Sequence, residues 1–149
     1  MVRARFDTVV HNRRLLDAFR GATPEETLEA FRTAGTIALP RPNSAAGLGE
    51  LVVHAEDVRR PLGVLHTYDK DGLLAVARFF TTRDFAVNSK SLVRGLTLVA
   101  TDSDFRHGSG PAVEGPLLAL VMVMAGRSAY LDELSGAGLP ELGRRLHGG

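Results

Sequence analysis

The sequence predicts a mainly helical α+β fold, and three observations carry this prediction. Apolar residues recur every three or four positions in four segments between residues 3 and 86, which is the period of an amphipathic helix. The segment 92–101 alternates as a strand does, and a turn-rich loop at 102–111 follows it. The chain has 149 residues, enough to bury one core but too few for two large independent ones. We therefore expect one compact chain with two subregions.

Four helices are predicted in the first part of the chain. Their expected ranges are 3–20, 23–33, 49–60 and 71–86. The second helix has a clear start signal, because Thr23 can cap it and Glu26 stands at the capping-box position. Leu28 and Phe31 are expected to form the buried face of this helix. The segment 37–47 contains two prolines and is predicted to be a connector.

The second part of the chain is predicted to contain strands and shorter helices. In the segment 92–101, Leu96, Leu98 and Ala100 alternate with Thr97 and Val99. The remaining expected elements are a short strand at 112–115 and helices at 116–125, 128–134 and 140–146. Phe79 and Phe80 of the preceding helix are assigned to the core.

Composition excludes several classes of protein. The formal net charge is +1 and the arginines are dispersed, so no nucleic-acid partner is expected. The chain has no Cys, which excludes a disulfide framework, a thiolate metal site and a Cys nucleophile. The N-terminal segment does not have the pattern of a signal peptide, and the apolar run Leu117–Ala125 is much shorter than a membrane span. We expect a cytoplasmic protein without membrane contact.

Glu50 and His54 form the most informative pair in the sequence. With about 3.6 residues per turn, they and Asp57 share one face of the predicted helix 49–60. The other side is apolar and is expected to pack: Leu48, Leu51, Val52, Ala55 and Val58. Carboxylate and imidazole are ordinary zinc ligands, so the pair could fill two coordination positions of a divalent metal. The same spacing is typical of a solvated helix face, and both interpretations stay open.

Two arginines end this helix just before Pro61. Proline disfavours continuation of the helix, so the helix is expected to stop near Arg60. Arg59 and Arg60 are predicted to be structural and to tie the helix end to nearby carbonyls or acids.

Two segments carry a recognisable pattern. They read Val52-Val53-His54-Ala55-Glu56-Asp57-Val58-Arg59-Arg60-Pro61-Leu62-Gly63 and Ala125-Gly126-Arg127-Ser128-Ala129-Tyr130-Leu131-Asp132-Glu133-Leu134-Ser135-Gly136. With the stretches 77–89 and 94–110, they resemble the actinobacterial mycothiol-dependent maleylpyruvate isomerase family of the DinB-like metal-binding superfamily. The resemblance covers most of the chain. It implies a partial DinB-like metal-binding helical bundle at 1–66 and a small α+β region at 67–149.

The resemblance places Glu50 and His54 on two of the family's three protein ligands for a divalent metal such as zinc. The third ligand in the family is a His on an early helix, and no matching segment occurs here, so we expect the chain to begin after it. His11, the sole His before Glu50, is left open as a substitute. A bundle that lacks this helix would leave an apolar groove, which predicts self-association.

Arg127 is the candidate catalytic residue. It follows Gly126 at the end of an apolar helix, where it could cap carbonyls or hold a substrate carboxylate in a bidentate pair. The resemblance implies that an Arg of this region serves the active site.

The resemblance also implies a metal-binding, mycothiol-dependent isomerase or transferase that acts on an electrophilic or unsaturated small molecule. Its partners are then a small-molecule substrate and a low-molecular-weight thiol. Asp57 is expected to orient the metal ligands. The alternative is a non-enzymatic or truncated member that has lost a competent metal site and acts as a binding module.

Overall fold

The computed structural model describes residues 8–33, 44–84 and 87–148. The chain divides into two compact units, Met1–Leu39 and Pro40–Gly149, and each is described by itself. The first unit contains α1 (Thr8–Phe19) and α2 (Pro24–Thr33). The division of the chain at 66/67 stays a prediction, and both of those residues belong to the second unit.

The start of α2 confirms the predicted capping box. The backbone N–H of Glu26 donates to Thr23 Oγ1 at 3.2 Å, and the backbone N–H of Thr23 donates to Glu26 Oε2 at 3.3 Å. The predicted buried face is wrong, because Leu28 is 48% exposed and Phe31 is 79% exposed. Helical period identifies an apolar face, but burial of that face needs a second apolar surface that the period does not specify.

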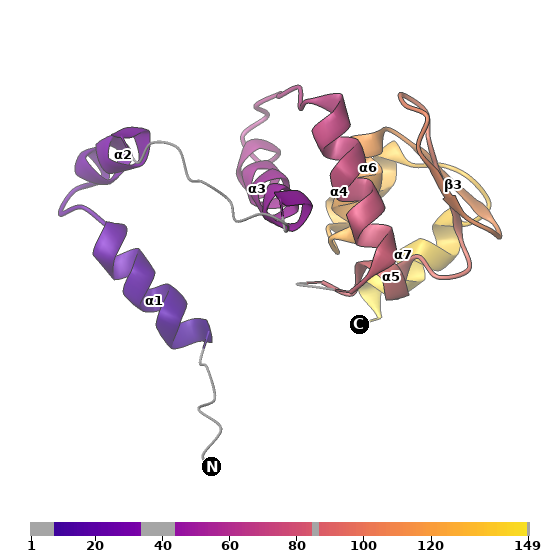
Figure 1. Ribbon diagram of the computed structural model, residues 1–149, viewed down its shortest axis with the longest axis horizontal. Coiled ribbons are helices and arrows are strands. Elements are labelled where there is room, and N and C mark those ends of the chain that lie inside the picture. Colours follow the sequence, from indigo (N-terminus) through magenta and orange to yellow (C-terminus); the bar gives the residue numbers. More distant parts are fainter. Residues whose placement is uncertain (1–7, 34–43, 85–86, 149) are drawn as a thin grey trace, which may run out of the picture. The chain divides into compact units, whose positions relative to one another are not determined.

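The second unit contains the rest of the described structure (Figure 1). Its elements are α3 (Ser44–Arg59), α4 (Lys70–Thr82), α5 (Ser89–Leu92), β1 (Thr97–Ala100), β2 (Arg106–Gly108), β3 (Ala112–Gly115), α6 (Leu117–Met124), the 3₁₀ helix η1 (Ser128–Glu133) and α7 (Leu139–His147). The predicted class, a mainly helical α+β fold, is confirmed.

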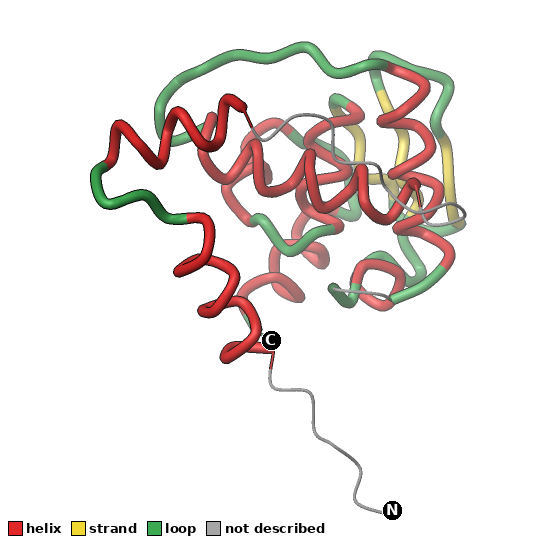
Figure 2. Tube along the Cα trace, turned by 60° about the vertical axis from the view of Figure 1, so that its left-hand side comes forward, coloured by secondary structure: helices red, strands yellow, loops and turns green. Residues whose placement is uncertain are grey.

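Helix α6 lies at the centre of the core of this unit. Seven of its eight residues are buried, and Leu118 is the half-buried exception. α6 packs against α4, η1 and the sheet, and α3 packs on α4 (Figures 1 and 2). The core face of α4 includes Val76 and Phe80, so the assignment of Phe80 to the core is confirmed. Phe79 is half-buried against the same core.

The sheet has three short strands in the order β2-β1-β3. β1 runs antiparallel to β2, with Leu98 opposite His107, and parallel to β3, with Leu98 opposite Val113. The predicted strand at 92–101 is too long, because Ser89–Leu92 forms a helical turn and Gly95 follows with φ of +74°. β2 was not predicted, since its three residues are all exposed and show no apolar alternation.

Helix boundaries also differ from the predictions. α3 begins at Ser44, inside the predicted connector, and ends at Arg59 as expected from Pro61. α4 ends at Thr82 because Arg83 takes an extended conformation. The remaining predicted elements of the second unit, at 112–115, 116–125, 128–134 and 140–146, are present with small shifts, and 128–134 is a 3₁₀ helix. Within the described ranges, no helix has both the length and the apolar character needed to cross a membrane.

The predicted apolar side of α3 is only partly buried. Val52 is 2% exposed, as predicted, whereas Leu51 and Val58 are 64% and 61% exposed. Ala55 is half-buried. α3 carries apolar residues over most of its circumference, and α4 can cover only one side of it.

Glycine positions give a test of this fold. A Cβ at Gly115 would lie 2.5 Å from Leu134 Cδ2 and 2.7 Å from the Glu133 carbonyl oxygen, whereas at Gly143 the nearest atom is 3.9 Å away. We expect Gly115→Ala to lower the free energy of unfolding by about 1–3 kcal/mol through overpacking. Gly143→Ala, inside α7, should raise it by about 0.5–1 kcal/mol. Urea denaturation followed by circular dichroism measures both changes, and equal stability of the two variants would contradict the packing of η1 on β3.

Candidate functional site

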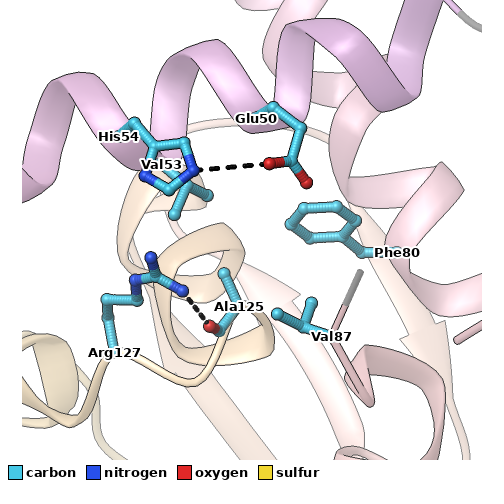
Figure 3. A pocket seen from close by; sticks show the side chains of 7 residues that line it. All are labelled: Glu50, Val53, His54, Phe80, Val87, Ala125 and Arg127. Carbon is cyan, nitrogen blue, oxygen red and sulfur yellow. Dashed lines mark hydrogen bonds and ion pairs between the residues drawn. The ribbon is translucent and has the colours of Figure 1, made fainter. Parts of the chain in front are cut away.

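A pocket of ≈ 190 Å³ opens between α3, α4 and the end of α6 (Figure 3). Its lining residues are Glu50, Val53, His54, Phe80, Val87, Ala125 and Arg127. The three candidate residues of the sequence analysis, Glu50, His54 and Arg127, therefore lie around one cavity. Arg127 is far from the other two residues in the sequence but close to them in space, because α3 and α6 both pack against α4.

Glu50 and His54 point toward each other across one helical turn (Figure 3). His54 Nε2 lies 3.4 Å from Glu50 Oε2, and the two side chains are 67% and 48% exposed. With zinc–ligand bonds of about 2.0–2.1 Å and tetrahedral angles, two ligand atoms on one ion lie about 3.4 Å apart. The separation is therefore suitable for two ligands of a single metal ion.

Asp57 contacts the other ring nitrogen of His54. Its Oδ2 atom lies 3.3 Å from His54 Nδ1. Arg127 holds the same carboxylate in a bidentate pair, with Nε donating to Oδ1 at 3.0 Å and Nη2 donating to Oδ2 at 2.7 Å. Hydrogen bonding from Arg127 lowers the pKa of the Asp57 carboxyl, so this group is ionised at neutral pH. A fixed carboxylate thus faces Nδ1.

This geometry is compatible with a ligand role for His54. A neutral imidazole that carries its proton on Nδ1, facing Asp57, presents a lone pair on Nε2. Glu50 presents a second acceptor 3.4 Å from that lone pair. Two acceptors at this distance and orientation are able to share a metal ion.

Arg127 also caps the helix that precedes it. Its Nη1 donates to the Ala125 carbonyl oxygen at 2.7 Å (Figure 3). Gly126 turns the chain with φ of +84°, a conformation that favours glycine at a helix C-terminus. The predicted capping role is confirmed, whereas binding of a substrate carboxylate stays a prediction. The pair with Asp57 raises the pKa of Arg127.

A buried polar network around Glu56 of α3 was not predicted. Glu56, 7% exposed, accepts hydrogen bonds of 2.7 Å from the hydroxyls of Tyr68 and Tyr130. Arg59 Nη1 donates to the Tyr68 hydroxyl at 2.7 Å. These bonds link α3 to η1 and to the segment before α4. The sequence did contain one indication of this network. Glu56 lies one helical turn after Val52, which was predicted to be buried, and a charged residue at such a position requires hydrogen-bond partners.

The predicted structural role of the two arginines is supported by their contacts. The Arg60 guanidinium stacks over the Tyr130 ring at 3.9 Å from the centroid. It also donates to the Glu133 carboxylate and to the Ala129 carbonyl oxygen. Arg59 Nη1 lies 3.9 Å from Glu56 Oε1. The end of α3 is therefore tied to η1, which contributes to holding His54 near Arg127.

Of the three metal ligands expected from the resemblance, the two with an assigned residue, Glu50 and His54, lie within the described ranges. Over the ranges 8–33, 44–84 and 87–148, no group of three or more His, Asp or Glu side chains has the arrangement of a metal site. The His11 side chain lies outside the described structure, so its role as a substitute stays open.

Comparison with known proteins returned no match. No model of a protein family, no curated protein and no solved structure matches the chain. Membership of the isomerase family stays a prediction from the sequence motifs.

The Glu56 network gives a pH test, because Tyr68 and Tyr130 are the two tyrosines of a chain without Trp. Burial, and then hydrogen bonding to Glu56, raises the pKa of Tyr68 to about 12 and also raises the pKa of Tyr130. An unfolded tyrosine has a pKa of about 10. The contribution of the two protonated tyrosines to the stability of the fold is therefore fully present below about pH 10. It is lost as the pH rises through their pKa values in the folded state. Ultraviolet titration should show no tyrosinate at pH 10 in the folded protein. Half-ionised tyrosine at that pH would contradict the network, and the urea-unfolded chain is the control.

Proposed function

We propose that this protein binds a divalent metal ion through Glu50 and His54 and carries out thiol-dependent chemistry on a small electrophilic or unsaturated molecule. The observation that carries the proposal is the position of His54, whose Nδ1 faces an ionised Asp57 while Nε2 lies 3.4 Å from Glu50. Carboxylates that orient a ligating histidine in this way are common in metal sites. The sequence motifs add mycothiol as the thiol.

The donor set fits zinc or a similar ion. Imidazole nitrogen and carboxylate oxygen are both ordinary zinc ligands, and open coordination positions are typical of catalytic sites. Two protein ligands hold a metal less tightly than three, so weak binding is expected. A bound divalent metal lowers the pKa of a coordinated thiol, which makes thiolate available near neutral pH.

The pocket supports a small substrate with an apolar part. Val53, Phe80 and Ala125 form apolar walls, and Arg127 adds a cation beside them. A cavity of ≈ 190 Å³ suits a substrate with few heavy atoms. A substrate carboxylate could contact the Arg127 guanidinium, although Asp57 already occupies its Nε and Nη2. In this proposal Arg127 positions Asp57 and, through it, His54.

Metal binding tests the proposal directly. After dialysis the protein should hold well below one zinc ion per chain, and titration with Co²⁺ should show saturable binding. His54→Ala and Glu50→Gln should each weaken the binding at least tenfold, because each removes one ligand. His107→Ala, at an exposed position of β2, is the matched control and should bind as the parent does. If His54→Ala binds Co²⁺ like the parent, the proposed site is wrong.

The thiol is tested with the cobalt-loaded protein. Addition of mycothiol should produce a thiolate-to-cobalt absorption band, and this band should be missing in His54→Ala. Metal binding without any response to thiols would reject the thiol-dependent activity and favour the binding-module alternative.

Orientation of His54 gives a separate prediction. Asp57→Asn should weaken metal binding about 10–100-fold, because the amide cannot supply the charge that orients the ring. Arg127→Lys should have a smaller effect in the same direction, since a lysine cannot form the bidentate pair. Isothermal titration with Zn²⁺ measures both. Parent-like affinity in Asp57→Asn would show that Asp57 does not act on the metal site.

A further inference from the structure

Exposed apolar residues of the second unit are confined to one region. Among the described residues of 40–149, the large hydrophobic side chains that are exposed are Leu51 (64%), Val58 (61%), Leu62 (70%), Val64 (51%) and Leu65 (97%). All of them belong to α3 or to the segment that follows it. Together with Ala55 we call these residues the α3 face. The large apolar residues of α4, β1 and α6 are instead buried or half-buried.

The α3 face has the pattern of a helix-packing surface. Leu51, Ala55 and Val58 are spaced by four and three residues, so they form a stripe along α3, and Leu62 continues this spacing in the turn that follows. The stripe lies away from Val52 and Val53, which are buried. A helix that is apolar on two sides is normally covered on both.

We propose that the α3 face is an interface between two copies of this chain. In a two-fold dimer the same face is used by both copies, so one apolar stripe supplies both halves of the contact. The small side chain of Ala55, between Leu51 and Val58, allows the two helices to approach closely.

The size of the α3 face is consistent with a dimer. Scaled by their exposed fractions, the five large side chains offer roughly 200–400 Å² of apolar surface per copy, taking about 60–120 Å² for a fully exposed Leu or Val. A standard interface buries about 800 Å² per partner, of which about 60% is apolar. The face therefore supplies about half or more of the apolar area that a stable dimer needs, before Ala55 and the flanking residues are added.

The dimer would also enclose the metal site, an extension that rests on the proposed function. His54 borders the stripe, because it is three residues from Leu51 and four from Val58. Its side chain is 67% exposed. A second copy on the α3 face would cover this open side and bring its own side chains next to Glu50 and His54.

Association is tested by placing a charge on the face. The parent chain should form a dimer in analytical ultracentrifugation at micromolar concentration. Leu51→Asp and Val58→Asp should each raise the dimer dissociation constant about 30-fold or more, because a buried carboxylate then faces an apolar surface. Ala75→Asp, at an exposed position of α4, is the matched control and should dimerise like the parent. A parent-like far-ultraviolet circular dichroism spectrum and a cooperative melting transition show that the variants fold.

Single cysteines give an independent test, because the chain has no Cys of its own. Leu51→Cys, Ala55→Cys and Val58→Cys sample the stripe, and a disulfide requires the two Cα atoms to lie within about 7 Å. Under mild oxidation at least one of these variants should form a covalent dimer much faster than Ala75→Cys.

Three results would overturn the proposal. One is a monomeric parent chain. Another is cross-linking of the stripe positions no faster than that of Ala75→Cys. The third is a dimer that survives Leu51→Asp and Val58→Asp but dissociates in Phe31→Asp, which would assign the contact to α2. None of these outcomes depends on metal, so the proposed interface and the proposed metal site can be rejected independently of each other.

Discussion

Burial of α6 is the constraint on which the second unit depends. The segment Leu117–Met124 is apolar along its whole length, and water is excluded from all sides except part of Leu118. Each fully buried side chain of this kind contributes about 1.5–3 kcal/mol relative to an exposed one. α4, η1 and the sheet are the surfaces that cover it. Since α3 packs on α4, the position of α6 also determines what lies beside α3.

The candidate site follows from the end of this helix. The chain turns at Gly126, where the buried helix has ended. The Arg127 guanidinium then donates to both the Ala125 carbonyl oxygen and the Asp57 carboxylate. Asp57 in turn faces His54 Nδ1 at 3.3 Å. The helix end therefore contributes to the orientation of an exposed histidine through the Asp57 carboxylate. The bond from Tyr130 to Glu56 also links η1 to α3, so a second contact holds the two elements together.

Local sequence signals predicted much of this structure. The capping box at Thr23, the strand at 112–115 and the stop before Pro61 are all encoded within a few residues. The i, i+4 spacing of Glu50 and His54 likewise predicted that the two side chains would meet. Such features depend on backbone preference and helix geometry alone.

Features that depend on tertiary packing were not predicted. The pairing of Arg127 with Asp57 joins residues 70 positions apart, and the Tyr130 bond to Glu56 joins residues 74 apart. β2 forms because β1 is available to pair with it, not because of its own composition. The exposure of Leu51 and Val58 has the same origin, since a period shows which face is apolar but not what covers it.

In the proposed function, Glu50 and His54 bind one metal ion, and Asp57 and Arg127 help to position these ligands. A crystal of the protein grown with zinc, measured at wavelengths on both sides of the zinc absorption edge, locates that ion without reference to activity. We expect an anomalous peak about 2.0–2.2 Å from both His54 Nε2 and a Glu50 oxygen, with Asp57 still beside Nδ1. An ion bound elsewhere, or a Glu50–His54 pair that remains free of metal at saturating zinc, would contradict it.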